Sequence, residues 1–174
     1  MKTLKLFFVL IPMVAFISCE KKDDRISVEK YVRLLKTNKY KNAKLPAFTL
    51  EDISELLRYR NEKDVITNFP RNGLSSAFHV EVELGIYILW TIESIRMSSI
   101  TGYTRIFPSL EPFLIPRNPE DFELGYDPVA HQQEAHQTAS NAYYNWWTSS
   151  YVSSLSFDLY IQIDPLKDTK YKWY

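Results

Sequence analysis

The segment LGIYILWTIESIRMSS, residues 84–99, most constrains how this chain can fold. Residues 86–90 are apolar whichever side of a helix they occupy, and a helix that is apolar all round has to be buried all round. We therefore expect a central helix here, with the rest of the chain packed around it. Glu93 and Arg96 lie three residues apart, so they share a face of this helix and can form an ion pair worth about 0.2–0.5 kcal/mol if exposed.

Three further helices are predicted around the central one. The first covers about residues 27–39, where apolar side chains recur at helical spacing. The second begins at Thr49, an N-cap residue with Asp52 three positions later. The third begins at Asp127-Pro128, an acidic N-cap followed by a proline at the first helical position. The predicted buried stripe of this third helix consists of Ala135, Ala139, Ala142, Tyr143 and Trp146.

The remaining segments are predicted to be irregular or extended. Residues 102–127 form a long proline-rich loop, because four closely spaced prolines exclude a regular helix there. Residues 155–163 alternate strictly between apolar and polar side chains, and Tyr171 and Trp173 are placed to form the returning strand of a hairpin. The predicted fold class is therefore mainly α: a compact helical domain of about four helices with a long proline-rich loop and a small C-terminal β-hairpin.

The N-terminus has the pattern of a secretory signal. Lys2 and Lys5 provide a positive start, and a nearly unbroken apolar run follows up to residue 17. This run is shorter than the roughly 20 apolar residues of a membrane-spanning helix. The stretch Phe16-Ile17-Ser18-Cys19 resembles a bacterial lipobox with Phe16 where leucine is usual, which implies cleavage before Cys19 and acylation of this residue. The alternative is a free thiol, because no second cysteine exists to form a disulfide within the chain.

We therefore predict a lipoprotein signal peptide over residues 1–18, a polar tether over 19–26 and a single mostly helical domain over 27–174. The residues after Cys19 resemble the charged export tag of Bacteroidetes lipoproteins, in which lysine followed by acidic residues sends the protein to the cell surface. The candidate tag residues are Lys22, Asp23 and Asp24, and the alternative is an ordinary polar tether. The expected location is the outer membrane, through a lipid anchor, with the domain exposed at the cell surface; a periplasmic orientation is the alternative.

Composition excludes several kinds of partner. Loss of residues 1–18 removes two lysines and leaves 19 basic residues against 21 acidic ones, a net charge of about −2. No basic run is long enough to hold a phosphate backbone, so nucleic acid is not an expected partner. The four glycines form neither a GxxxxGK nor a GxGxxG motif. We predict no cofactor.

The segment HQQEAHQ resembles a zinc-protease motif with one residue out of place. In HExxH and HxxEH motifs the two histidines lie four residues apart and reach the same metal ion. Here His131 and His136 lie five apart, which separates their directions on a helix by about 140°. Only His131 and Glu134 share a face, so we predict no metal site and interpret these residues as solvated polar side chains.

Other catalytic patterns are equally unspecific. The serine pairs of the chain do not lie within a GxSxG motif, and nothing in the spacing ties His79 to a serine and an acid. Pairs of acidic residues could serve glycoside cleavage, but any domain of this size offers such pairs. We therefore assign no catalytic residue.

Aromatic residues gather in the last 32 positions of the chain. Adjacent Trp146 and Trp147 point about 100° apart on a helix, so one can be buried while the other is exposed. Trp146 continues the alanine stripe, which makes Trp147 the better surface candidate. We predict a binding surface formed by Trp147, Trp173 and Tyr171, since exposed rings stack on sugars and anchor protein interfaces. The alternative is that these rings belong to the core.

Three segments resemble a family of small Bacteroidetes lipoproteins of uncharacterised function: FTLEDISELLRYRNEKDVITNFPRN, LGIYILWTIESIR and DPLKDTKYKW. This resemblance implies the size and location given above and no established activity. Residues 49–98 also resemble one HEAT-type helical hairpin. A single hairpin is weak evidence for a solenoid, which needs about three stacked repeats.

The predicted function is that of a lipid-anchored binding protein of the cell envelope without evident catalytic activity. Its partner would be the membrane through the anchor, and either another envelope protein or a glycan through the aromatic C-terminal part and the proline-rich loop. The first alternative is a hydrolase of surface polymers, with His131 and Glu134 as candidates, and the second is a purely structural envelope component. A polar pocket that holds His131, Glu134 or Glu93 would favour the enzyme.

Overall fold

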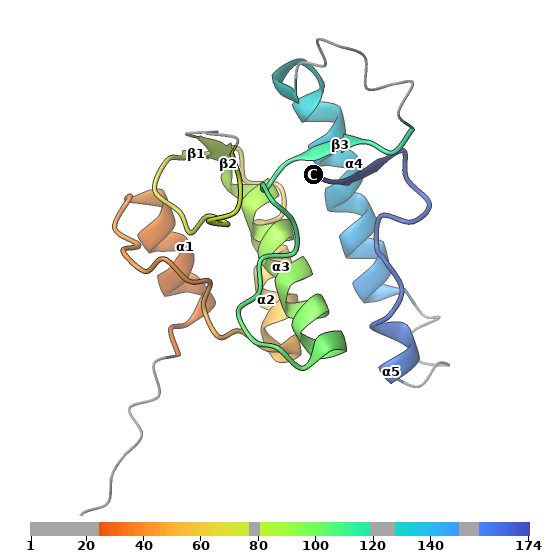
Figure 1. Ribbon diagram of the computed structural model, residues 1–174, viewed down its shortest axis with the longest axis horizontal. Coiled ribbons are helices and arrows are strands. Elements are labelled where there is room, and N and C mark those ends of the chain that lie inside the picture. Colours follow the sequence, from red (N-terminus) through yellow and green to blue (C-terminus); the bar gives the residue numbers. More distant parts are fainter. Residues whose placement is uncertain (1–24, 77–80, 119–127, 150–156) are drawn as a thin grey trace, which may run out of the picture.

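The central helix of the fold is α3 (Leu84–Thr101), which lies between α1 (Val28–Lys36) and α4 (Pro128–Thr148) (Figure 1). The computed structural model describes residues 25–76, 81–118, 128–149 and 157–174. These residues form a mainly helical domain with two small two-stranded sheets. The predicted fold class is confirmed. Within the described ranges, none of the helices combines the length and apolar composition that a membrane-spanning segment requires.

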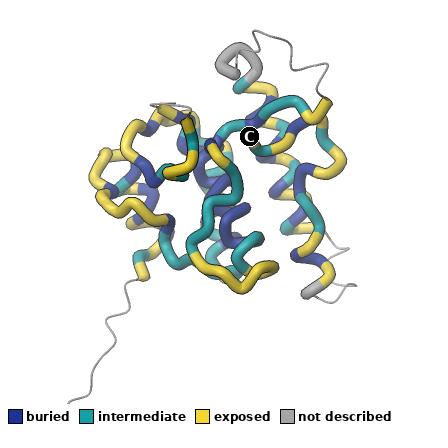
Figure 2. Tube along the Cα trace, viewed as in Figure 1, coloured by how far each residue is buried: buried dark blue, intermediate teal, exposed yellow. Residues whose placement is uncertain are grey.

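Helix α3 is buried along most of its length, as its apolar sequence predicts. Every residue from Leu84 to Arg96 is buried, and Figure 2 shows these residues running through the middle of the molecule. The helix ends at Gly102, whose φ of 75° lies in the left-handed region that glycine adopts without a steric penalty. The rest of the domain therefore packs around α3 as around an axis.

Two helical segments cover one side of α3. Helix α1 begins after Ser27, whose hydroxyl accepts a hydrogen bond from the backbone N–H of Lys30, and it ends three residues before the predicted boundary. The second segment is a short 3-10 turn η1 (Leu50–Asp52), then α2 (Ile53–Leu56), then a second 3-10 turn η2 (Leu57–Tyr59). Its predicted start is confirmed, since the backbone N–H of Thr49 donates to Asp52 Oδ2 at 2.7 Å. Ile26, predicted within the polar tether, packs against the core.

A first antiparallel pair joins the loops between α2 and α3. Strand β1 (Val65–Ile66) pairs with β2 (Val82–Glu83), so that Ile66 lies opposite Val82. In addition to this strand pair, helices α2 and α3 contact each other directly. The likeness of residues 49–98 to a HEAT hairpin stays a prediction.

A second antiparallel pair holds the C-terminus, but its partner strand differs from the predicted one. Strand β4 (Tyr171–Trp173) pairs with β3 (Leu114–Pro116), which comes from the proline-rich loop. Pro116 closes this ladder opposite Tyr171, at an end of the pair, where a residue without an N–H is tolerated. A C-terminal β element is thus confirmed, and the assignment of residues 157–163 to it is wrong.

The alternating segment forms a helical turn instead of a strand. Residues 157–160 are helix α5 (Phe157–Tyr160), and residues 155 and 156 lie outside the described ranges. Tyr160 and Ile161 are buried next to each other while Leu159 is 60% exposed, an order that a strand with one buried face cannot produce. Packing of Tyr160 and Ile161 against the core outweighs the alternating pattern.

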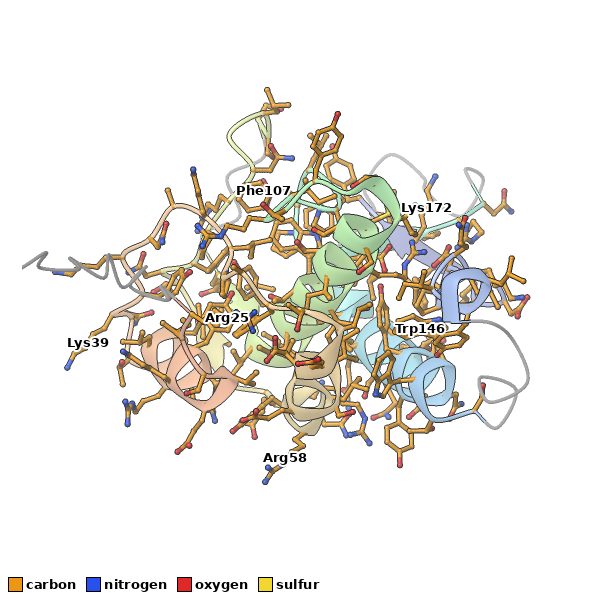
Figure 3. The ribbon with its side chains drawn as sticks, turned by 90° about the horizontal axis from the view of Figure 1, so that it is seen from below. Arg25, Lys39, Arg58, Phe107, Trp146 and Lys172 are labelled. Atoms are coloured by element: carbon orange, nitrogen blue, oxygen red, sulfur yellow. The ribbon has the colours of Figure 1, made fainter. Side chains whose placement is uncertain are left out.

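Helix α4 packs its predicted small-residue stripe toward α3 and β3. Ala135, Ala139, Tyr143 and Trp146 are buried, and Ala142 is half-buried. In the view of Figure 3, Trp146 lies at α4, whereas exposed Lys39 and Arg58 project away from the helices. The C-terminal part of α4 faces the segment that follows α5, and this junction forms the candidate site.

Candidate functional site

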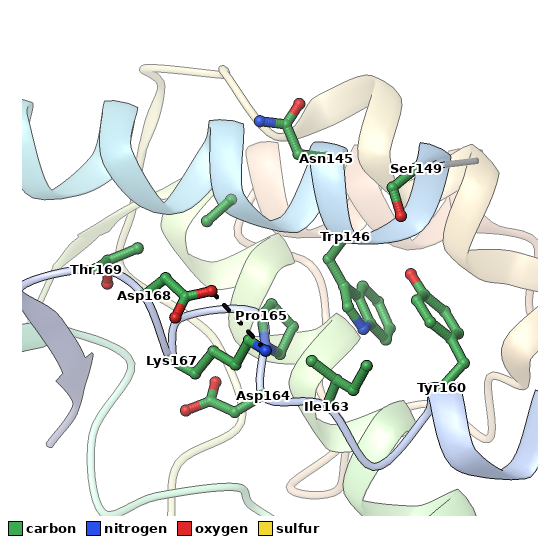
Figure 4. A pocket seen from close by; sticks show the side chains of 11 residues that line it. Asn145, Trp146, Ser149, Tyr160, Ile163, Asp164, Pro165, Lys167, Asp168 and Thr169 are labelled. Carbon is green, nitrogen blue, oxygen red and sulfur yellow. Dashed lines mark ion pairs between the residues drawn. The ribbon is translucent and has the colours of Figure 1, made fainter. Parts of the chain in front are cut away.

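A cavity of about 360 Å³ lies between the C-terminal part of α4 and the segment after α5 (Figure 4). Its volume falls within the range of pockets that bind small ligands. Two aromatic side chains, Trp146 from α4 and Tyr160 from α5, form one wall. The other lining residues are Ala142, Asn145, Ser149, Ile163, Asp164, Pro165, Lys167, Asp168 and Thr169.

The segment that forms the floor of the cavity is held in two consecutive turns. Asp164 Oδ1 accepts a hydrogen bond from the backbone N–H of Leu166 at 2.8 Å, as expected for an aspartate that precedes a proline turn. The Thr169 hydroxyl donates to the Leu166 carbonyl oxygen at 2.9 Å. Arg117, directly after β3, donates from Nη2 to the carbonyl oxygens of Leu166 and Tyr171 at 3.1 and 3.2 Å. The floor is therefore fixed to the β3–β4 sheet.

The aromatic wall is a stack of two rings. The rings of Trp146 and Tyr160 lie nearly parallel, at 13°, with centroids 5.1 Å apart. Tyr143 and Trp147 contact Trp146 from its other sides, with ring centroids 6.1 and 5.6 Å away. Figure 4 shows the two rings side by side, with the Trp146 indole nitrogen pointing toward Ile163.

Both aromatic residues carry a buried donor without a partner. Trp146 Nε1 and the Tyr160 hydroxyl are buried, and neither has a hydrogen-bond partner among the described residues. Each such group costs about 1–3 kcal/mol, because it has lost its bonds to water without replacement. Trp146 and Tyr160, which line the cavity, carry two of the five unpartnered buried polar atoms in the described part of the chain. Because both atoms are inaccessible to water, neither faces the open volume of the cavity.

Burial also fixes the protonation state of the tyrosine. Desolvation raises the pKa of the Tyr160 hydroxyl well above its ordinary value of 10.0. The residue is only 2% exposed, so a charged phenolate would lack hydration. Tyr160 therefore remains a neutral hydroxyl throughout the physiological pH range, and it can donate a hydrogen bond.

The rim opposite the aromatic wall is polar and carries both signs of charge. Lys167 Nζ lies 3.9 Å from Asp168 Oδ2, and both side chains are largely exposed. The Asp164 carboxylate pairs with Arg117 at 3.3 Å. Asn145 on α4 and Ser149, directly after this helix, are exposed and line the cavity from the other side. The cavity thus combines an aromatic wall with a polar rim whose two carboxylates are ion-paired.

The three residues predicted to form a binding surface are not among the described residues that line this cavity. Tyr171 is 2% exposed, so its ring is unavailable to a ligand in this conformation. Trp147 and Trp173 are half-buried and pack against the core. The indole of Trp147 donates to Ser54 Oγ at 2.8 Å, and that of Trp173 donates to the Tyr143 hydroxyl at 2.8 Å. The expectation that these residues bind a partner stays a prediction.

The histidine segment is arranged differently from its prediction. The side chain of His131 lies outside the described part, and Glu134 is exposed and pairs with Lys170 at 2.7 Å. His136, expected to be solvated, is 1% exposed; this prediction is wrong. Its Nε2 donates to the Arg60 carbonyl oxygen at 2.7 Å, and its Nδ1 contacts the Glu83 carboxylate. Helix α4, which carries His136, can approach α3 so closely because residue 85, in the first turn of α3, is glycine.

Glu93 and Arg96 form their predicted pair, but inside the protein. Arg96 Nε and Nη2 donate to the two oxygens of Glu93 at 2.9 and 2.6 Å, and both side chains are 7% exposed. The Tyr143 hydroxyl donates to Glu93 Oε2 at 2.7 Å. Burial, followed by the nearby Glu93 carboxylate, holds the pKa of Tyr143 well above 10.0. This network joins α3 to α4, and it leaves Glu93 without a free oxygen for acid–base work.

Tyr160, Asp164 and Asp168 line the cavity but were not predicted as site residues. Tyr160 falls in the segment predicted to be a strand, and the aspartates carry no motif; only the DP turn signal at 164–165 marks their segment. Cys19 and the tag residues Lys22, Asp23 and Asp24 lie outside the described residues. Across the described ranges, no group of three or more histidine, cysteine, aspartate or glutamate residues is placed to hold a metal ion.

Comparison with known proteins identifies the family of the chain. A family model described as a domain of unknown function (DUF4943) matches residues 22–174. The chain belongs to this family. No curated protein and no solved structure matches it.

Proposed function

We propose that this DUF4943 domain is a lipid-anchored protein of the cell envelope that acts by binding, with the cavity between α4 and residues 160–169 as its binding site. The observation that carries this proposal is the cavity itself, about 360 Å³, with a stacked aromatic wall of Trp146 and Tyr160 and a polar rim. A concave site of this size that combines apolar side chains with a few polar groups is the usual form of a small-ligand site.

The lipid anchor is proposed from the N-terminal sequence. Acylation at Cys19 would attach the chain to the outer membrane, and Lys22, Asp23 and Asp24 would direct it to the cell surface. Five residues lie between Cys19 and Arg25, where the described structure begins, so Cys19 and Arg25 are at most about 20 Å apart. The domain would therefore stay close to the membrane, where its ligand would be a component of the envelope or of material that reaches the surface.

The cavity favours binding over hydrolysis. A glycoside hydrolase needs one carboxyl group kept protonated in an apolar enclosure and a second that stays ionised. Asp168 is exposed, and Asp164 accepts hydrogen bonds from Leu166 and Arg117, so neither has that enclosure. Glu134 points to solvent and pairs with Lys170, away from the described lining of the cavity.

The test of this proposal compares a variant with a filled cavity to a matched surface variant. Ala142→Leu places a larger side chain into the cavity, whereas Gln133→Leu adds the same side chain at an exposed position of the same helix. Each full-length chain, purified in detergent, is immobilised and exposed to envelope extract from the cells that make it, with retained mass as the readout. We expect retention by the wild type and Gln133→Leu, and at least tenfold less by Ala142→Leu. Equal retention by all three chains would refute the proposed site.

A cysteine substitution tests the anchor separately. Cells given an alkyne-tagged fatty acid should label the wild-type chain, and Cys19→Ala should abolish the label and release the chain from the membrane fraction. Labelling that persists in Cys19→Ala would show that the anchor is elsewhere.

A further inference from the structure

We infer that α1 and the loop after it, residues 28–44, form a basic face that docks on the anionic lipid headgroups of the membrane that carries the chain. Docking of this face turns the cavity away from the membrane. The inference goes beyond the proposed binding function and rests on its lipid anchor. Three observations lead to it: the distribution of charge along the chain, the exposure of the cations and the position of α1 in the fold.

The charge of the chain is divided between its first described segment and the rest. Residues 25–44 contain seven lysines and arginines and one acidic residue, Glu29, so their net charge is +6. Residues 45–174 contain 10 basic and 17 acidic residues, a net charge of −7. The near-zero net charge of the whole chain is therefore the sum of a basic end and an acidic body. A block of cations next to a membrane anchor is the pattern that anionic headgroups attract.

Most cations of this segment are exposed and available. Helix α1 buries one apolar stripe against the core and presents the opposite stripe to solvent. Lys36 on the outer stripe is already paired, with Glu62 at 2.6 Å and Asp64 at 2.9 Å. Five other cations are exposed and form no ion pair with any described residue: Lys30, Arg33, Lys39, Lys41 and Lys44. These five side chains can therefore reach the phosphates of lipid headgroups.

The loop after α1 holds its lysines in place. The ring of Tyr40 is buried against Tyr31, with ring centroids 5.0 Å apart, and its hydroxyl donates to the Lys44 carbonyl oxygen at 2.9 Å. Lys39 and Lys41, on either side of this buried residue, are both exposed. Figure 3 shows Lys39 projecting away from the molecule beside α1. The basic face is therefore preformed, so docking requires little ordering of the loop.

The position of α1 orients the domain on the membrane. Cys19 and Arg25 are at most about 20 Å apart, and α1 begins three residues after Arg25, so this helix stays within reach of the membrane. Helix α3 lies between α1 and α4 (Figure 1), which places the cavity on the far side of the domain from the basic face. Because attraction between exposed charges is screened beyond about 10 Å at 0.1 M salt, the side that touches the membrane decides the orientation.

The test measures the orientation of the mature chain on vesicles. The chain is purified from the membranes of the cells that make it and reconstituted into vesicles of phosphatidylcholine, with or without phosphatidylglycerol. A fluorophore is attached at Ala43→Cys in the basic face or at Ser149→Cys beside the cavity, two exposed positions, and acylated Cys19 offers no competing thiol. A lipid with a nitroxide on its headgroup quenches a fluorophore that touches the membrane. We expect quenching at residue 43 to rise with phosphatidylglycerol and to fall with added salt, and residue 149 to remain unquenched.

Two triple variants of equal charge assign the docking to this face. Both sets consist of exposed residues: Lys39→Gln, Lys41→Gln and Lys44→Gln in the basic face, and Lys167→Gln, Lys170→Gln and Lys172→Gln as the control. The control set lies on the other side of the domain, where Figure 3 shows Lys172. Each cation near an anionic surface changes the ratio of docked to undocked chain about fivefold, so the first set should lower this ratio about a hundredfold. The control set should be quenched at residue 43 as the wild type is.

The outcomes separate this inference from the lipid anchor, which is measured in the same samples by flotation of the chain with the vesicles. A chain that floats with both kinds of vesicle but is quenched equally in both at residue 43 would refute the basic face and leave the anchor intact. Equal quenching at residues 43 and 149, or equal losses in the two triple variants, would also overturn the inference. A chain that floats only with phosphatidylglycerol would support the basic face and refute the anchor, and one that floats with neither would refute both.

Discussion

Gly85 and His136 occupy a space that would not hold one more carbon atom. A Cβ atom at Gly85 would lie 2.5 Å from Nε2 of His136 and 2.6 Å from the carbonyl oxygen of Arg60. The same imidazole nitrogen donates to that carbonyl at 2.7 Å. The close approach of α4 to the start of α3 therefore depends on a glycine that neither helix pattern identifies.

Gly85→Ala should destabilise the domain by about 2–3 kcal/mol, because the added methyl group overpacks a buried site and displaces a hydrogen-bonded histidine. Urea denaturation followed by circular dichroism measures this change. Gly73→Ala is the control, since a Cβ atom there would have no neighbour within 4 Å. A Gly85→Ala variant that unfolds at the same urea concentration as Gly73→Ala would contradict the packing described for His136.

Glu93→Gln should destabilise the domain by about 3–5 kcal/mol. The substitution leaves the Arg96 guanidinium buried between α3 and the backbone of residue 161 without a counter-charge. The free energy of unfolding from urea titration provides the measurement. Glu134→Gln, which removes the partner of Lys170 at the surface, should unfold close to the wild type. Similar losses in the two variants would show that the Glu93–Arg96 pair is not buried in solution.

The burial of Glu93 and Arg96 illustrates what could and could not be predicted from the sequence. The all-round apolar pattern of residues 84–99 predicted a central helix, and the spacing of Glu93 and Arg96 predicted their pairing, since both depend only on local geometry. That the pair is enclosed depends on Tyr143, which is 50 residues away along the chain and donates to Glu93. Contacts of this kind require the packing of α4 on α3 to be known first.

The C-terminal sheet and the cavity could not be predicted from the sequence, because they too depend on contacts between distant parts of the chain. Alternation in residues 155–163 is a local signal for a strand, but the described part of this segment turns as α5 so that Tyr160 can stack on Trp146. Strand β4 then pairs with residues 114–116, more than 50 positions earlier, a register that no turn signal specifies. Because the cavity lies between α4 and this misassigned segment, its residues could not be assembled from the pattern.

Tyr160→Phe should reduce the loss of stability at alkaline pH. Because the pKa of Tyr160 is raised by desolvation in the folded state, the unfolded chain loses this proton first as the pH rises above about 10. The contribution of this residue is thus complete below pH 10 and falls at higher pH, by up to about 1.4 kcal/mol per pH unit. Urea titrations between pH 9 and 11.5 should show a shallower decline for Tyr160→Phe than for the control Tyr144→Phe. Parallel declines would mean that the Tyr160 hydroxyl is hydrated.

Tyr160→Phe should also leave stability at pH 7 unchanged or slightly higher, because the hydroxyl has no partner among the described residues. A comparison with Trp173→Phe makes the prediction specific, since the Trp173 indole does have a partner, the Tyr143 hydroxyl at 2.8 Å. Loss of that bond should cost about 1 kcal/mol or more. Destabilisation of Tyr160→Phe by as much as Trp173→Phe would indicate that the Tyr160 hydroxyl is bonded in the ligand-free protein.

Arg117→Ala should loosen the floor of the cavity without unfolding the domain. Arg117 Nη2 donates to the carbonyl oxygens of Leu166 and Tyr171. Because its side chain is half-exposed, its removal should destabilise the turns of the floor more than the packing of the core. The amides of Lys167 and Thr169 close the two turns of this floor, at 3.1 and 2.9 Å from their acceptors. Hydrogen exchange at these two amides should accelerate in Arg117→Ala, whereas the amides of α3 should exchange as in the wild type, because local opening does not require global unfolding.

Arg117→Lys should not restore protection, since an ammonium group cannot reproduce the planar fork of the guanidinium. If the two amides exchange at the wild-type rate in Arg117→Ala, the turns are stable by themselves, and the sheet does not position the binding site.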